Sequence, residues 1–270
     1  MVVQHNLSAM NTNRQMGVVT SALQKSTEKL SSGYKINRAG DDAAGLSISE
    51  KMRSQIRGLN KASDNAQDGI SLIQVAEGAL NETHSILQRM NELATQAAND
   101  TNTSVDRQSI KDEIEQLNEE LDRISSTTQF NKQDLLTGKF SGKLQVGALE
   151  GQTMDLKIST AVSSTGLKVK DIKVSTNENA GKAMKSIQDA IESVSKQRSK
   201  LGAIQNRLEH TINNLDTNAE NTQAAESRIR DTDMADEMVQ YSKNNILSQA
   251  GQSMLAQANQ QTQGVLSLLG

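Results

Sequence analysis

The feature that most constrains this chain is an apolar stripe that runs from Leu46 to Ala97. Its members recur about every 3.5 residues, which is the repeat of a coiled-coil seam. A helix of that length extends roughly 75–80 Å. Gly58, Gly69 and Gly78 each lower helix stability by up to about 1 kcal/mol, although small residues also let neighbouring helices approach closely. The stripe predicts one very long helix, which a compact globular domain does not need.

The amino-acid composition favours a rod over a globular core. The 270 residues include no Pro, no Cys and no Trp, with only two Phe and two Tyr. Without proline nothing forces a kink in a long helix, and without aromatic side chains a thin packing of Leu, Ile, Met and Ala is expected. The missing cysteine excludes disulfides, thiolate catalysis and cysteine metal sites.

Helical spacing returns on both sides of a short central region. Ile110, Ile114 and Leu121 mark a second helix, with Ser104 or Asp106 available as its N-cap. Apolar residues at helical spacing continue through 184–222 and again from 234 into the C-terminal tail. Long helices that leave and return lie antiparallel if they pack together, which brings both termini to one end.

The central region changes to a period of two, which is typical of strands. Apolar and polar residues alternate before and after the Gly147–Gly151 turn, so a β-hairpin is expected there. A further alternating stretch at 167–174 predicts additional short strands. The fold class is therefore mainly α: a long antiparallel helical rod, resembling a coiled-coil bundle, with a small β-hairpin region in the middle of the chain.

Both ends of the chain lack charge although the whole chain is 23% charged. Residues 1–13 and 244–270 contain no Asp, Glu, Lys or Arg, yet both keep apolar residues at helical spacing. A solvated helix normally carries charge on its outer face. These ends are therefore expected to pack against each other and against further copies of the chain, and to be disordered or loosely helical before they do so.

No residue pattern indicates an enzyme, a cofactor site or a metal site. His5, His84 and His210 lie in separate segments without a partner at ligand spacing, and no zincin, phosphate-loop or nucleophile-elbow motif occurs. A net charge of -3 gives no reason to expect nucleic acid. No Sec-type signal and no apolar run of about 20 residues is found, so export without a cleaved signal and no membrane insertion are expected.

Two long blocks resemble the terminal regions of bacterial flagellin. The first is EKLSSGYKINRAGDDAAGLSISEKMRSQIRGL from Glu28, and the second is RLEHTINNL from Arg207 followed by AAESRIRDTDMADEMVQYSKNNILSQAGQSMLAQANQ from Ala224. TTQFN at 127–131 also matches. The resemblance covers essentially the whole chain, with short Bacillus-type flagellins nearest.

The resemblance implies a structural subunit that polymerises into the helical tube of the flagellar filament for swimming. Residues 1–32 with 235–270 would form inner terminal helices, 33–45 a spoke linker, and 46–234 a helical rod with a hairpin at about 140–178. The larger surface domains would be missing, with 159–179 as a vestige of them. The expected polymerisation core comprises Leu7, Met10, Met16, Val19, Leu23, Leu247, Met254, Leu255, Val265 and Leu268.

The same resemblance implies several partners besides the chain itself. They are the filament cap, the hook-associated junction proteins and an export chaperone that holds the C-terminal tail around 244–269. The segment QRMNELATQ after Leu87 matches a patch that animal Toll-like innate immune receptors bind, which gives Arg89, Leu93 and Glu113 as contacts. From the residues alone this patch serves packing just as well.

Two other functions fit parts of the sequence. A hook-filament junction protein shares the terminal helices but is needed in far fewer copies. An intracellular coiled-coil adaptor predicts charged residues beside the seam and a stable oligomer in solution, and the uncharged tails argue against it.

Overall fold

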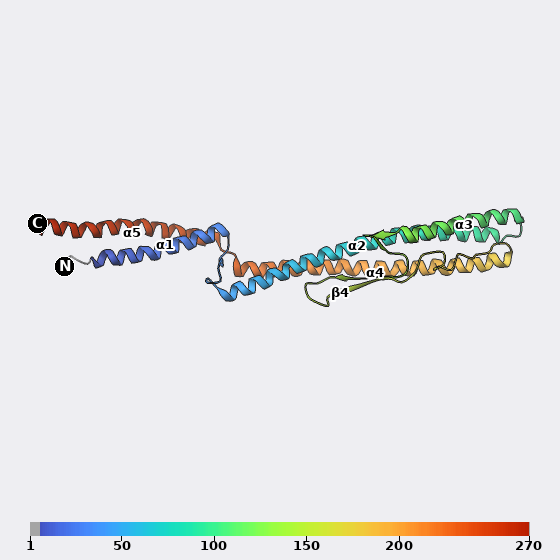
Figure 1. The fold of residues 1–270 in the computed structure, drawn as a ribbon, viewed down its shortest axis with the longest axis horizontal. Coiled ribbons are helices and arrows are strands. Elements are labelled where there is room, and N and C mark those ends of the chain that lie inside the picture. The colour runs from blue at the N-terminus through green and yellow to red at the C-terminus, as the bar shows by residue number, and fades with distance from the viewer. Residues whose placement is uncertain (1–5, 270) are drawn as a thin grey trace. The chain divides into compact units, whose positions relative to one another are not determined.

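A computed structural model describes the backbone of residues 6–269 and the side chains of residues 6–261. Within this part of the chain the fold is mainly helical, as the sequence predicts (Figure 1). The helices are α1 (Leu7–Ser32), α2 (Ala43–Ala97), α3 (Ser104–Thr127), α4 (Asn177–Arg230) and α5 (Met234–Leu269). The long stripe forms the 55-residue α2 without interruption, so its three glycines do not break the helix.

The strands lie between α3 and α4 and form two small antiparallel pairs. Strand β3 (Phe140–Gln145) pairs with β4 (Thr153–Ile158), with Phe140 opposite Ile158 and Gln145 opposite Thr153. This is the predicted hairpin. A shorter pair, β1 (Gln129–Phe130) with β2 (Gln133–Asp134), precedes it and has too few residues to give a periodic signal.

The prediction of strands at 167–174 is wrong. This segment forms turns, yet its apolar residues Leu167, Val169 and Val174 are buried. The alternation therefore indicates which side chains are buried in the core. It does not indicate that the segment pairs with another strand. Val162 and Ser164 are also fully buried, so the stretch between β4 and α4 contributes several side chains to the core.

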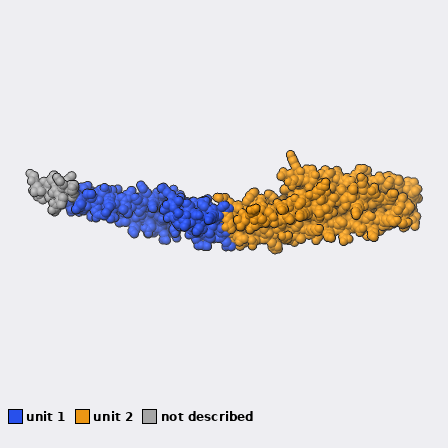
Figure 2. Space-filling view, turned by 60° about the horizontal axis from the view of Figure 1, so that its bottom comes forward, with its two compact units in different colours: residues 1–54, 221–270 blue, residues 55–220 orange. Residues whose placement is uncertain are grey.

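The chain divides into two compact units, shown in different colours in Figure 2. Unit 1 comprises residues 1–54 and 221–270, and unit 2 comprises residues 55–220, so α2 and α4 contribute to both. Unit 2 holds the main apolar core. Leu80 and Leu87 of α2, Leu121 of α3 and Leu156 of β4 are fully buried in this core together with Ile187 of α4.

The N-terminus of α3 is closed by a capping box. The amide and hydroxyl of Thr103 donate hydrogen bonds to the Asp106 carboxylate at 2.9 and 2.8 Å, and the Asp106 amide donates to the Thr103 hydroxyl. The cap residue is therefore Thr103, one position before the predicted Ser104, and Asp106 is its partner. The hydrogen bond from the Thr103 hydroxyl lowers the pKa of Asp106 below its ordinary value.

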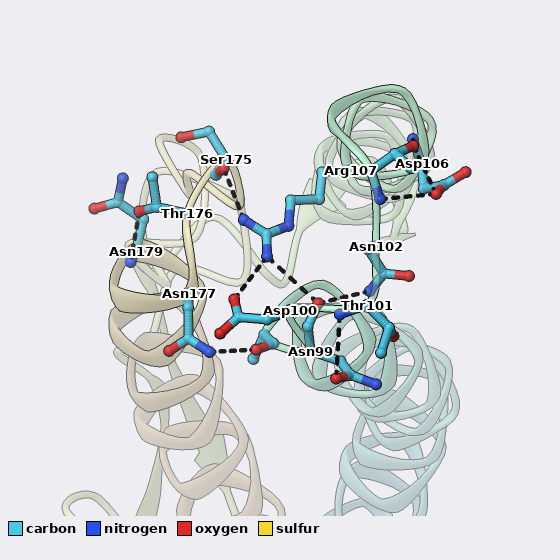
Figure 3. A network of polar contacts seen from close by, with 12 residues as sticks. Asn99, Asp100, Thr101, Asn102, Asp106, Arg107, Ser175, Thr176, Asn177 and Asn179 are labelled. Atoms are coloured by element: carbon cyan, nitrogen blue, oxygen red, sulfur yellow. Dashed lines mark hydrogen bonds and ion pairs between the residues drawn. The ribbon is translucent and has the colours of Figure 1, made fainter.

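Side chains from three elements close the end of unit 2 where α2 finishes (Figure 3). The Arg107 guanidinium of α3 donates to the carbonyls of Ser175 and Asn99 and pairs with Asp100 at 3.2 Å. The Asn177 side chain at the start of α4 donates to the Ala98 carbonyl. Carbonyls at a helix C-terminus have no partner within the helix, and these contacts satisfy them.

Candidate functional site

A joint in unit 1 connects the four helix ends that meet there. Gly33, with a φ of +75°, ends α1 in the left-handed conformation that glycine adopts without strain. The Lys35 amide then donates to the Arg230 carbonyl and the Thr232 amide donates to the Gly33 carbonyl. The Arg230 guanidinium lies 4.6 Å from the centre of the Tyr34 ring and pairs with Glu50 at 3.0 Å. These contacts fix where α1 and α5 begin their pairing.

Small and polar residues form the contact line between α1 and α5. Ser26 is buried on α1 and Ala258 is buried on α5, and Gly251 of α5 lies beside Met16. The Asn6 side chain donates to the Ala258 carbonyl at 2.9 Å. Among the described side chains of these two helices only Ser26 and Ala258 are buried, at 5% and 8% exposed, so the pair has almost no apolar core of its own.

The residues predicted as the polymerisation core divide between this contact line and the solvent. Four of them are half-buried in the pair: Met16, Val19, Leu23 and Leu255. Four are exposed: Leu7, Met10, Leu247 and Met254, of which Leu7 is 70% exposed. Val265 and Leu268 lie outside the residues whose side chains the structure describes.

Other large apolar residues on α1 and α5 are exposed as well. Val18 of α1 is 62% exposed and Ile246 of α5 is 67% exposed, and neither was predicted from the sequence. Met234, Met238 and Val239 near the start of α5 are exposed as well. We call the six exposed residues that lie farther along the two helices the outer stripe: Leu7, Met10, Val18, Ile246, Leu247 and Met254. Exposed apolar residues gathered on helix segments that carry little charge mark a protein interaction site.

Hydroxyl side chains on the same helices are turned back onto their own backbone. Thr12 and Thr27 of α1 and Ser253 of α5 each donate to the carbonyl four residues earlier, at 2.8–3.1 Å. Each of these donors is therefore satisfied without water.

The second predicted site brings α2 and α3 together in unit 2. The Arg89 guanidinium donates to the Glu113 carboxylate at 2.9 Å and to Glu92 at 3.2 Å, and the bond to Glu113 raises the pKa of Arg89. Leu93, expected beside them at the surface, is only 2% exposed and belongs to the core. Leu93 therefore packs in the core of the isolated chain, and its role as a receptor contact stays a prediction.

Comparison with known proteins decides the family. The profile described as the bacterial flagellin N-terminal helical region matches residues 3–141, and that of the bacterial flagellin C-terminal helical region matches residues 184–269. The chain belongs to the bacterial flagellin family.

Relatives of this flagellin match along its full length. The flagellins of Halalkalibacterium halodurans and Bacillus subtilis are 58% and 52% identical to it, with all of both chains covered in each case. The flagellar filament 31.3 kDa core protein of Treponema maltophilum is 51% identical, again with full coverage. This flagellin is therefore a structural subunit of the bacterial flagellar filament, which places it in the extracellular filament.

Two solved structures support the fold of this flagellin. The crystal structure of Bacillus cereus flagellin is 32% identical, covers 60% of this chain and 94% of its own, and has a TM-score of 0.51. A putative flagellar hook-associated protein from Vibrio parahaemolyticus has a TM-score of 0.60 over 71% of this chain at 12% identity, which shows a shared fold alone. The junction-protein alternative is not favoured, because the full-length relatives are flagellins and filament core proteins.

Within the described residues, no group of His, Asp and Glu side chains is arranged to hold a metal ion. His84 contacts Gln88 on α2, and His5 lies outside the described part of the chain. None of the described helices is both long and apolar enough to cross a membrane.

Proposed function

We propose that this flagellin polymerises through the outer stripe of α1 and α5. The observation that carries the proposal is the exposure of the apolar residues on this pair, with Leu7 at 70% and Ile246 at 67%. Between 244 and 261 no charged side chain opposes burial against another subunit. Covering the stripe contributes about 25 cal/mol per Å² of apolar surface, which one molecule cannot gain alone.

The proposed polymer is a helical tube with the paired terminal helices inside. Residues 1–32 and 235–270 line its channel, 33–45 form the spoke, and 46–234 form the outer rod. A contact between different surfaces of successive copies gives an open helix when its rotation does not close into a ring. The terminal helices become fully ordered as they join, which limits assembly in free solution.

Seeded assembly tests this function. Replacing Ile246, Leu247 and Met254 by Gln removes apolar surface without adding charge, and we expect the critical concentration to rise at least about tenfold, since 1.4 kcal/mol corresponds to a factor of ten. Val75→Gln with Val105→Gln is the matched control, because both valines are exposed in unit 2. Normal elongation of the α5 variant on filament seeds contradicts the proposal.

A second test removes the terminal helices. A chain trimmed to residues 40–235 keeps unit 2 and should remain monomeric when seeds are added. Sedimentation and negative-stain microscopy of trimmed and full-length chains follow the outcome. Fibres that form as readily from the trimmed chain would exclude the terminal helices as the assembly element.

We also propose the partners that a secreted filament subunit needs. The exposed apolar side of α5 fits an export chaperone that covers 244–269 before secretion, because uncovered apolar stripes aggregate. Export proceeds through the flagellar secretion apparatus without a cleaved signal. The filament cap and the hook-associated junction proteins contact the same terminal helices at the two ends of the polymer.

A further proposed partner is an animal Toll-like receptor, with Arg89 and Glu113 as surface contacts. Both side chains are about half exposed in the isolated chain, at 51% and 44%. Arg89→Ala should weaken receptor activation by monomers about tenfold or more, as expected for an arginine at the centre of an interface. Arg53→Ala provides the control, and equal loss by both variants contradicts the assignment.

A further inference from the structure

A basic hollow lies where the loop before α4 meets the first turns of that helix. Its volume is about 400 Å³, and four lysines and one carboxylate border it: Lys168, Lys170, Lys173, Lys182 and Asp171. We call it the lysine hollow. The segment 165–186 contains five lysines and two carboxylates, a local net charge of +3 in a chain whose net charge is -3. Charge is therefore concentrated on this surface with the opposite sign to the whole molecule.

Most of these ammonium groups have no counter-ion among the residues that the structure describes. Among the described residues, Lys168, Lys170 and Lys173 have no carboxylate within ion-pair distance, and only Lys182 pairs, with Glu178 at 2.6 Å. The surface cations elsewhere in unit 2 are more often paired, as Arg89, Lys111 and Arg123 are. Like charges close together repel, and an anion between them removes that repulsion.

The backbone beneath the lysine hollow is held by buried hydrogen bonds. The Ser164 amide and hydroxyl donate to the Asp122 carboxylate at 2.7 and 2.8 Å. The buried Asn118 side chain donates to the Val169 carbonyl at 3.3 Å. Because Val169 is buried, Lys168 and Lys170 on either side of it must face solvent. These hydrogen bonds thus fix the backbone from which the two lysine side chains project.

Lys168 adopts a backbone conformation that is unusual for its residue type. Its φ of +59° lies in the left-handed region, where a residue with a side chain is strained. The Lys168 amide donates to the Thr165 carbonyl and the next amide donates to the Ser164 carbonyl. These hydrogen bonds hold the turn, and Lys132, which does not border the hollow, has a similar φ of +62°.

The groups around the lysine hollow select the class of ligand. Ammonium groups bind phosphate as point charges, and the Thr165 and Ser186 hydroxyls at the rim are further donors. Among the described residues that border the hollow, none is aromatic and none is arginine, so bases have nothing to stack on. Lys173 also borders a second hollow with Arg107 and Lys111, so the basic surface continues beyond one anion.

We propose that the lysine hollow binds a linear polyphosphate, which is a chain of phosphates without bases, through its charge. The proposal is independent of assembly through α1 and α5, since the residues concerned are different. It also gives this flagellin a function that its filament role does not require.

Binding of inorganic polyphosphate to full-length monomers, measured by calorimetry over a series of salt concentrations, tests the proposal. Replacing Lys168, Lys170 and Lys173 by Gln should lower affinity at least about tenfold and reduce the slope of log affinity against log salt by about 2. The control replaces Lys143, Lys196 and Lys200 by Gln, which removes the same charge from exposed positions elsewhere in unit 2. Arginine at the three hollow positions should retain binding.

Three results would overturn the proposal. They are equal losses in the hollow and control variants, polyglutamate binding as tightly as polyphosphate, and single-stranded nucleic acid binding far more tightly than polyphosphate. Circular dichroism and seeded assembly of the Gln variant should match the original chain. If assembly fails while polyphosphate binding is normal, only the proposed polymerisation is affected.

Discussion

At the residue scale, the capping box of α3 shows how one ionised group contributes to folding. The Asp106 carboxylate accepts two hydrogen bonds from Thr103, which favour its charged form in the folded chain. The folded pKa is lowered, so this contribution is present above the unfolded value of about 3.9 and is lost as pH falls through the folded pKa.

We therefore expect Asp106→Asn to reduce the pH dependence of stability on the acid side. Between about pH 5 and pH 2 the thermal midpoint of the original chain should fall more steeply than that of the variant, because the variant has no proton to gain at this position. Asp112→Asn, on the same helix, is the control. Parallel midpoint curves for the original chain and the Asp106 variant would show that the capping carboxylate does not act this way.

Single residues also mark the limit of what periodicity predicts. The spacing of Leu93 is that of a core residue, and the structure buries it, although the family resemblance suggested a surface contact. On α1 and α5, spacing identified apolar residues but not which of them face the partner helix. Met16 and Leu255 face it, whereas Met10 and Met254 do not, because both sides of these helices carry apolar residues.

At the element scale, the glycines of α2 have different surroundings. A Cβ on Gly58 would lie 2.8 Å from the Ala148 Cβ at the turn between β3 and β4, so the turn needs a bare backbone there. A Cβ on Gly78 meets nothing within 4 Å. The sequence predicted the helix through both positions but gave no means to distinguish them, because the contact with Ala148 joins residues far apart in the chain.

These surroundings predict opposite effects of alanine. Gly78→Ala should stabilise the chain by about 0.5–1 kcal/mol through helix propensity. Gly58→Ala gains the same propensity but must displace the hairpin turn, with a cost of about 1–3 kcal/mol typical of overpacking. Denaturant unfolding of both variants measures the difference in their free energies of unfolding. Equal stabilisation by the two substitutions would mean that the hairpin turn moves aside without an energetic cost.

The segment between β4 and α4 shows why an alternating apolar pattern can be buried without forming strands. The alternation of Leu167, Val169 and Val174 predicted strands, and the structure buries all three side chains in a segment without strands. A strand also needs the backbone of a neighbouring strand as its hydrogen-bond partner. Here the Val169 carbonyl accepts a hydrogen bond from the Asn118 side chain instead. Pattern analysis detects burial, whereas the choice between strand and turn depends on partners distant in the sequence.

At the scale of the whole molecule, the two units differ in how their helices are supported. Unit 2 buries large apolar side chains from α2, α3, α4 and β4 in one core, whereas the described side chains of α1 and α5 bury almost none. Helices with few buried apolar contacts open at low free energy. The sequence predicted this contrast, because charge is absent from the ends of the chain and abundant between them.

Hydrogen exchange should report this contrast directly. In monomers we expect amides of α1 and α5 to exchange at least about a hundredfold faster than those of α2 and α4 in unit 2, a gap of about 2.7 kcal/mol. In filaments the terminal helices should become as protected as unit 2. Equal protection in both states would show that α1 and α5 are complete without neighbours.

The hydroxyl groups of Thr12, Thr27 and Ser253 have a further consequence once subunits cover them. Each hydroxyl already donates to a carbonyl of its own helix. Removing water therefore leaves no hydroxyl donor without a partner, and the neighbouring subunit does not have to supply an acceptor. A lattice built over such surfaces loses little when one strand of subunits shifts along the next. For the proposed tube we therefore expect more than one helical arrangement of the subunits to have similar stability.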